Sequence, residues 1–239
     1  MSNTKSARRR RDQLRQVTIE PAASAAAGAV TITQGATRVL CTASISTNPP
    51  AWLNDPETGV PTRGWVTAEY SMMPGSTPER QRRGPSSRGT EIQRLIGRSL
   101  RAAVDLAKMP GVAITCDCDV MVADGGTRTA SITGAYVALA QALAAAREQG
   151  LIAADPLHGP VAAVSVGVVA GQVYLDLDYE LDAAAEVDMN VVMNHRDQYV
   201  ELQGTGEAGT FSREQLDQML ELAGKGIRKL MMVQRAAVG

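Results

Sequence analysis

The sequence predicts an α+β protein made of two halves, each with several short strands followed by one or two helices. Short runs alternate apolar and polar side chains, which is typical of half-buried strands. Longer runs repeat apolar residues at helical spacing. This rhythm occurs twice along the 239 residues. We therefore expect two sheet-and-helix halves within one domain, residues 16–239, connected through 151–160. A basic N-terminal segment, residues 1–15, precedes the domain and can be flexible.

The first half begins with short antiparallel strands between residues 16 and 47, separated by the turns PAASAAAG and QGAT. The run WVTAEYSMM predicts another strand, followed by a polar, basic loop over 74–90. Apolar residues at helical spacing predict a helix over 91–107, and alternation predicts a strand over 112–122. A second helix is expected over 130–149, where small side chains favour close packing.

The second half contains four expected strands: VAAVSVGVVAG, QVYLDLDYE, AEVDMNVVM and YVELQGTG. Ser212 and Gln215 have the spacing of a capping box, so a last helix is expected from 212 to about 234. The longest apolar stretch, 161–171, is too short to span a bilayer, and no signal peptide is visible. We therefore expect a cytoplasmic protein with no membrane partner.

Composition limits the kinds of site that the chain can build. With one Phe and two Trp, an aromatic platform for stacking nucleic-acid bases is disfavoured. Cys41, Cys116 and Cys118 are too few and too irregular for a disulfide framework. The last two share a strand face, but no second Cys or His pair completes a zinc site. We expect all three to be buried as small apolar residues.

The net charge of −1 conceals a strong asymmetry along the chain. Residues 5–15 hold six basic residues and one acid, and residues 79–101 hold seven arginines and two acids. Residues 172–193 hold six acids and no base. Basic segments attract polyanions through counterion release, although each run alone is also compatible with a solvated surface.

The stretch ADGGTRTASITGAYVALAQALAAA places a glycine-flanked hydroxyl and arginine cluster just before a predicted helix. Free backbone N–H groups at a helix N-terminus bind anions, and glycine lets the anion approach. Arg128 adds a bidentate phosphate ligand, and Thr127 or Thr129 a hydroxyl donor. Arg88 comes just before the preceding predicted helix and can bind phosphate in the same way. The alternative for Gly126 to Thr129 is a turn with a threonine N-cap.

The acidic stretch LDLDYELDAAAEVDMNVVM contains a second candidate site. In the expected strand, Glu186, Asp188 and Asn190 share one face, and Asp182 falls in the turn before it. Gathered carboxylates repel one another unless a cation joins them. A Mg²⁺ ion bound by one or two carboxylates and a substrate phosphate fits this group. A solvent-facing acidic strand is the alternative.

Several blocks resemble the ribonuclease PH family, in the family's order and over nearly the whole chain. They include GWVTAEYSMMP, EIQRLIGRSLR, ADGGTRTASITGAYVALA, LDLDY, AEVDMNVVM and ELQGTGE. The resemblance implies the α+β fold of the ribosomal protein S5 domain 2-like type. It also implies phosphate-dependent 3′→5′ trimming of precursor tRNA, with release of nucleoside diphosphates and reverse nucleotide addition.

The resemblance also implies roles for individual residues. Inorganic phosphate, the co-substrate, would be held by Arg88, Gly126, Thr127 and Arg128. Asp182 and Asp188 would serve the metal, Mg²⁺, and catalysis. The loop with Arg80, Arg82 and Arg83 would contact tRNA. The family assembles as a homo-hexamer, a trimer of dimers.

The sequence departs from the family pattern in three places. The family's N-terminal Arg-x-Asp-Gly-Arg is replaced by a run of arginines, and the segment around Arg88 reads Ser-Arg-Gly-Thr-Glu. Leu181 stands where the family usually has a carboxylate. His158 and His195 match no catalytic position and are expected in loops.

Two further functions remain open beside the phosphorolytic enzyme. One is a catalytically inactive ring subunit that only binds RNA. The other is a hydrolytic nuclease that uses the acidic pair to activate water. Retention of both the phosphate-binding arginines and the acidic pair favours the enzyme, and a phosphate site argues against hydrolysis.

Overall fold

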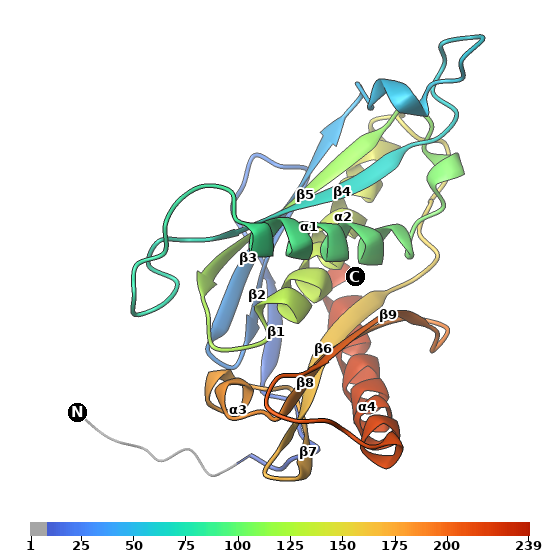
Figure 1. Cartoon of the computed structure of the whole chain (residues 1–239). Coiled ribbons are helices and arrows are strands. Elements are labelled where there is room, and N and C mark those ends of the chain that lie inside the picture. Colours follow the sequence, from blue (N-terminus) through green and yellow to red (C-terminus); the bar gives the residue numbers. More distant parts are fainter. Residues whose placement is uncertain (1–8) are drawn as a thin grey trace.

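The structure, a computed structural model, describes residues 9–239 and confirms the α+β class (Figure 1). The first sheet has the strand order β1-β2-β3-β5-β4, and only the β4–β5 pair is parallel. Its strands are β1 (Val17–Pro21), β2 (Gly28–Gln34), β3 (Thr37–Ser46), β4 (Trp65–Met72) and β5 (Ala113–Val122).

The second sheet is antiparallel throughout, with the order β7-β6-β8-β9. Its strands are β6 (Val161–Val169), β7 (Gln172–Leu175), β8 (Val187–Asn194) and β9 (Tyr199–Gly206). The helices are α1 (Ser87–Arg101), α2 (Thr127–Glu148), α3 (Tyr179–Ala183) and α4 (Arg213–Val238). Single 3₁₀ turns occupy Ala51–Leu53 and Leu106–Lys108.

Helix α2 lies between the two sheets and contacts β2 and β3 on one side and β6 on the other (Figure 1). Close approach explains its small side chains. A Cβ added at Gly134 would come within 2.8 Å of Ile32 and Cys41. By length and composition α2 could also cross a membrane, but 83% of its most apolar window is buried inside the protein. It is therefore the central core helix.

The protein has two apolar cores, which lie on opposite faces of β6. One face of β6 packs on α2 in the core of the first half, and the other packs on α4. Burial on both faces explains the uninterrupted apolar run of this strand. Cys41, Cys116 and Cys118 are buried free thiols, as predicted for small core residues. His158 and His195 lie in loops, as predicted.

Both predicted helices of the first half begin earlier than expected. Helix α1 begins at Ser87, because the Ser86 side chain caps it by accepting from the Gly89 N–H, and it ends at Arg101 rather than at 107. Helix α2 begins at Thr127 rather than at 130. Arg88, Thr127 and Arg128 therefore lie in the first turns of helices, not before them.

The prediction of one strand over QVYLDLDYE was wrong in its second part. Strand β7 ends at Leu175, and Asp176 adopts a positive φ of 60° that turns the chain. Asp178 then caps α3 by accepting from the Leu181 N–H at 3.0 Å. Asp182 consequently lies on a short helix and not in a turn.

Candidate active site

The N-termini of α1 and α2 converge near Tyr70, at the end of β4. The Tyr70 hydroxyl and the Thr127 Oγ1 lie 2.9 Å apart in a hydrogen bond. Burial raises the pKa of Tyr70, while the nearby positive charges of Arg88 and Arg128 act in the opposite direction. The two arginines predicted to hold phosphate are thus close to the same phenol. Tyr70 was not predicted as a site residue, because it lies in an alternating pattern that is typical of any half-buried strand.

The glycines before α2 form a left-handed turn that delivers the chain into the helix. Gly125 has a φ of 72° and Gly126, the N-cap, a φ of 66°. No side chain caps the first turn of α2, and the Thr129 hydroxyl donates to the Gly126 carbonyl at 3.0 Å. The alternative of a threonine N-cap is therefore wrong. The first-turn N–H groups retain their capacity to bind an anion.

Arg128 is held in place from both halves of the molecule. Its guanidinium lies 3.7 Å from the Glu91 carboxylate on α1 and donates to the Gln203 amide oxygen on β9 at 3.2 Å. Gln203 in turn donates to Glu91 at 2.7 Å. Both partners lie within quoted blocks, EIQRLIGRSLR and ELQGTGE, but they were not predicted to hold Arg128, because spacing along the chain does not show contacts between distant segments.

The acidic pair comes from the second half, with Asp182 on α3 and Asp188 near the start of β8. Desolvation raises the pKa of Asp188, and the neighbouring carboxylates of Glu207 and Asp182 raise it further. Desolvation also raises the pKa of Asp182, although its side chain reaches solvent, and the Arg88 charge opposes that rise. The structure therefore brings both aspartates near each other and near the arginines.

The donor set at the acidic pair fits a hard divalent cation. The Asp188 Oδ1 atom is buried and has no hydrogen-bond partner in the described part of the chain. Between residues 9 and 239, no group of three or more His, Cys, Asp or Glu side chains is arranged to hold a metal. A Mg²⁺ ion with two carboxylates would thus need water and substrate oxygens to complete its shell, which is its common habit.

The third predicted group lies apart from these residues. Arg80, Arg82 and Arg83 are exposed in the loop between β4 and α1, which projects from the body of the molecule (Figure 1). An exposed loop of this kind is accessible to a large ligand without obstructing the helix N-termini.

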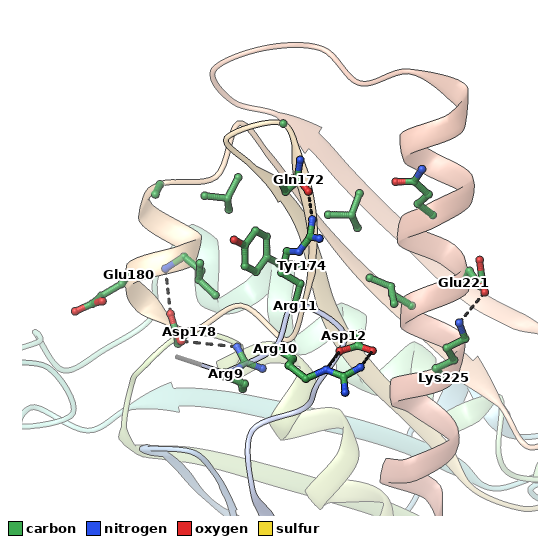
Figure 2. A pocket seen from close by; sticks show the side chains of 17 residues that line it. Arg9, Arg10, Arg11, Asp12, Gln172, Tyr174, Asp178, Glu180, Glu221 and Lys225 are labelled. Atoms are coloured by element: carbon green, nitrogen blue, oxygen red, sulfur yellow. Dashed lines mark hydrogen bonds and ion pairs between the residues drawn. The ribbon is translucent and has the colours of Figure 1, made fainter. Parts of the chain in front are cut away.

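The described part of the N-terminal basic segment packs along the second half. It borders a groove of about 1190 Å³ with β7, α3 and α4. In Figure 2, Arg9 points to Asp178, Arg10 pairs with Asp12, and Arg11 reaches Gln172. This groove is separate from the N-terminal turns of α1 and α2, so its size does not mark the phosphate site. Residues 1–8 lie outside the described part.

Comparisons with known proteins identify the family of the chain. A family model described as 3′ exoribonuclease family, domain 1, matches residues 13–144, and the model for domain 2 matches residues 159–226. Ribonuclease PH of Corynebacterium efficiens is 52% identical over 244 residues, covering 100% of this chain and 98% of the relative. That of Corynebacterium diphtheriae is 53% identical over 234 residues, covering 95% and 94%.

Solved structures show the same fold. A chain of the Archaeoglobus fulgidus exosome, solved with RNA bound to the active site, has a TM-score of 0.78 at 22% identity, covering 93% of this chain and 89% of that one. A chain of an archaeal exosome core has a TM-score of 0.76 at 21% identity, with 95% and 89% covered. With each half matching one domain of the same family and complete relatives about half identical, the chain belongs to the 3′ exoribonuclease family.

Proposed function

We propose that the protein is a phosphate-dependent 3′→5′ exoribonuclease that trims precursor tRNA and releases nucleoside diphosphates. The observation that carries the proposal is the electrostatic influence of Arg88 and Arg128 on Asp182, and of Arg128 on Asp188, which places the arginines and the acidic pair in one neighbourhood. An anion site and an acidic pair in one place suit a reaction between two phosphate groups. The relatives named Ribonuclease PH support the same activity.

Inorganic phosphate is the attacking group in this proposal. Arg88, Arg128 and the Thr127 hydroxyl, with the N–H groups from Gly126 onward, hold it at the first turn of α2. An oxygen of the bound phosphate attacks the phosphorus of the last phosphodiester. The bond to the 3′ oxygen of the preceding nucleotide breaks, and the last nucleotide leaves as a diphosphate. Holding two anions against their repulsion is the main catalytic task.

The acidic pair serves the departing 3′ oxygen. That oxygen must gain a proton, and a carboxyl group with a raised pKa retains one to higher pH than an ordinary aspartate. Asp182 and Asp188 both have a raised pKa, so either suits the role. Asp182 and Asp188 would also hold Mg²⁺, which would supply positive charge near the scissile phosphate. The same groups serve the reverse reaction, in which a diphosphate adds a nucleotide to an RNA 3′ end.

The exposed arginines hold the body of the RNA. Arg80, Arg82 and Arg83 supply three phosphate contacts without base recognition. This suits a substrate class such as precursor tRNA and other structured RNA, including ribosomal RNA precursors. We further propose a homo-hexamer, a trimer of dimers, as the resemblance of the sequence to the ribonuclease PH family implies, and a cytoplasmic location, as expected from the sequence.

The deciding experiment incubates a 3′-extended tRNA with the purified protein and Mg²⁺, with and without inorganic phosphate, and resolves the released nucleotides. Nucleoside diphosphates that appear only with phosphate are expected. Monophosphates released without phosphate would mean hydrolysis. RNA that binds without any release would favour the alternative, a catalytically inactive RNA-binding ring subunit.

A further inference from the structure

A buried ion pair lies behind the glycine turn at the start of α2. The Asp176 carboxylate is completely buried, and the Arg15 side chain is 7% exposed. Arg15 Nη2 donates to Asp176 Oδ1 at 2.7 Å, and its Nε lies 3.1 Å from both carboxylate oxygens. The Arg15 backbone N–H donates to Oδ2 at 2.7 Å. Gln34 adds a fourth donor at 2.7 Å, and Arg9 a fifth at 3.4 Å.

The same guanidinium also binds the glycine turn directly. Arg15 Nη1 donates to the carbonyl of Asp124 at 2.5 Å, and Nη2 to that of Gly125 at 3.4 Å. Thr37 donates to the Gly125 carbonyl at 2.7 Å and accepts from the Asp124 N–H at 3.0 Å. These contacts occupy the carbonyls on the inner side of the turn. The first-turn N–H groups of α2 remain for a ligand.

The fit between the arginine and the turn leaves little free space. A Cβ added at Gly126 would lie 3.0 Å from Arg15 Nη2. A Cβ at Gly125 would lie 2.6 to 2.8 Å from backbone atoms of residues 177–179. The turn is thus packed between Arg15 and the segment that leads into α3.

Asp176 belongs to that segment, so the ion pair connects both parts of the site. Asp176 follows β7 directly and has a left-handed conformation, and two residues later Asp178 caps α3. The Tyr179 N–H donates to the Asp124 side chain at 3.4 Å. The turn that would hold phosphate and the helix that carries Asp182 are therefore fixed to the same buried pair.

We propose that Arg15 and Asp176 are positioning residues that set the glycine turn of α2 for phosphate and hold it against the α3 segment. This rests on the proposed function of the turn as the phosphate site. Neither side chain needs to touch the phosphate. Each acts through the backbone of residues 124–126, where a displacement of about 1 Å can reduce the rate roughly 100-fold.

The test compares two variants with a matched control. Arg15→Lys keeps the charge but loses the planar fork that binds carboxylate and carbonyls together. Arg15→Met combined with Asp176→Asn removes both charges of the pair, so neither is left buried without the other, and Asn tolerates the positive φ. Arg9, which also lies 3.4 Å from the Asp176 carboxylate, keeps Asp178 at 3.7 Å. The control is Arg10→Ala in the same segment, since the 79% exposed Arg10 side chain pairs only with neighbouring Asp12 in the described part.

Two readouts separate positioning from general stability. The first is the KM for phosphate beside the KM for RNA in the trimming reaction. The second needs no activity: the rise in thermal unfolding temperature with added inorganic phosphate, against chloride at equal ionic strength. We expect both variants to raise the phosphate KM roughly 10- to 100-fold and to weaken the phosphate-induced rise, with the RNA KM unchanged. Arg10→Ala should match the wild type.

Folded variants with wild-type phosphate KM and stabilisation would overturn the inference. Loss of folding in both variants would also overturn it, because the pair would then support the whole fold rather than the turn. Failure of the proposed function would be seen in the wild-type protein alone. It would release no product that depends on phosphate, and phosphate would not raise its unfolding temperature specifically.

Discussion

The two halves of the molecule have similar architecture but contribute opposite charges to the site. The first half presents the N-termini of α1 and α2, with Arg88 and Arg128 in their first turns. The second half presents Asp182 and Asp188 beside the β8–β9 edge. The two arginines and the acidic pair come from different halves, so the site exists only where the halves meet.

The difference also separates the two tasks of the proposed reaction. In that reaction the cationic half would bind the attacking phosphate, so its residues would chiefly set the affinity for phosphate. The acidic half would serve the leaving oxygen and the scissile phosphate, so its residues would chiefly set the rate. Substitutions in the two halves should therefore change different kinetic constants, and the predictions below test that separation in order of expected effect.

The largest effect is expected in the acidic half. Asp188→Asn removes a carboxyl with a raised pKa, so kcat should fall roughly 10²- to 10⁴-fold, while phosphate binding survives. Single-turnover release from a 3′-extended RNA measures the rate. Glu180→Gln, an exposed neighbour of the pair on α3, is the control and should keep wild-type kcat. A wild-type kcat in Asp188→Asn would remove this residue from the chemistry.

The next largest effect is expected in the cationic half. Arg128→Ala loses charge-assisted bonds to phosphate, so the phosphate KM should rise roughly 10- to 100-fold, with a smaller change in kcat at saturating phosphate. Initial rates over a phosphate series, at fixed RNA, give both constants. Arg94→Ala, an exposed arginine on α1, provides the comparison. A change confined to kcat would contradict the division of tasks between the halves.

A smaller effect is expected outside both charged clusters. Replacing Arg80, Arg82 and Arg83 together with Ala removes three exposed charges, so the slope of log K against log salt should become shallower by roughly 2 to 3. Filter binding of tRNA at several salt concentrations measures the slope. Trimming of a short oligonucleotide should stay near the wild-type rate. An unchanged slope for tRNA would show that RNA is held elsewhere.

Sequence reasoning located the strands of the first half closely, because alternation and turns are local signals. It located helix starts less well, since the cap at Ser86 and the left-handed glycines before α2 are decided by backbone geometry. It missed α3, because a short polar helix capped by Asp178 has no periodicity to detect.

The partners of the site residues were beyond local reasoning. Glu91 and Gln203, which hold Arg128, stand 112 positions apart in the chain. The Arg15–Asp176 pair joins positions 161 apart. Motifs in the sequence indicate which residues can do chemistry, whereas the fold decides which distant side chains position them.

The smallest effect concerns stability rather than activity. The substitution that should lower kcat most, Asp188→Asn, should raise the stability of the folded protein. Asp188 has a raised pKa in the folded protein, chiefly through desolvation and then through Glu207 and Asp182. Its folded form therefore binds a proton more tightly than its unfolded form, whose pKa is near 3.9. Stability contributed by protonation is complete at low pH and is lost as the pH rises through the folded-state pKa. At neutral pH the ionised carboxylate is destabilising.

Asp188→Asn should therefore unfold at a higher temperature than the wild type at pH 7, in EDTA to exclude metal binding. The difference should shrink as the pH falls toward 4, where the wild-type carboxyl gains its proton. Thermal unfolding of both proteins across this range is the measurement, with Glu180→Gln again as the exposed control. If Asp188→Asn unfolds at a lower temperature than the wild type at pH 7, or if the difference in unfolding temperature does not depend on pH, then ionised Asp188 does not destabilise the folded protein. A higher unfolding temperature for the variant, with a difference that shrinks at low pH, would show that the ionised carboxylate of Asp188 lowers the stability of the folded protein. The acidic half would then depend on positive charge from the arginines and from bound ligands to offset that destabilisation.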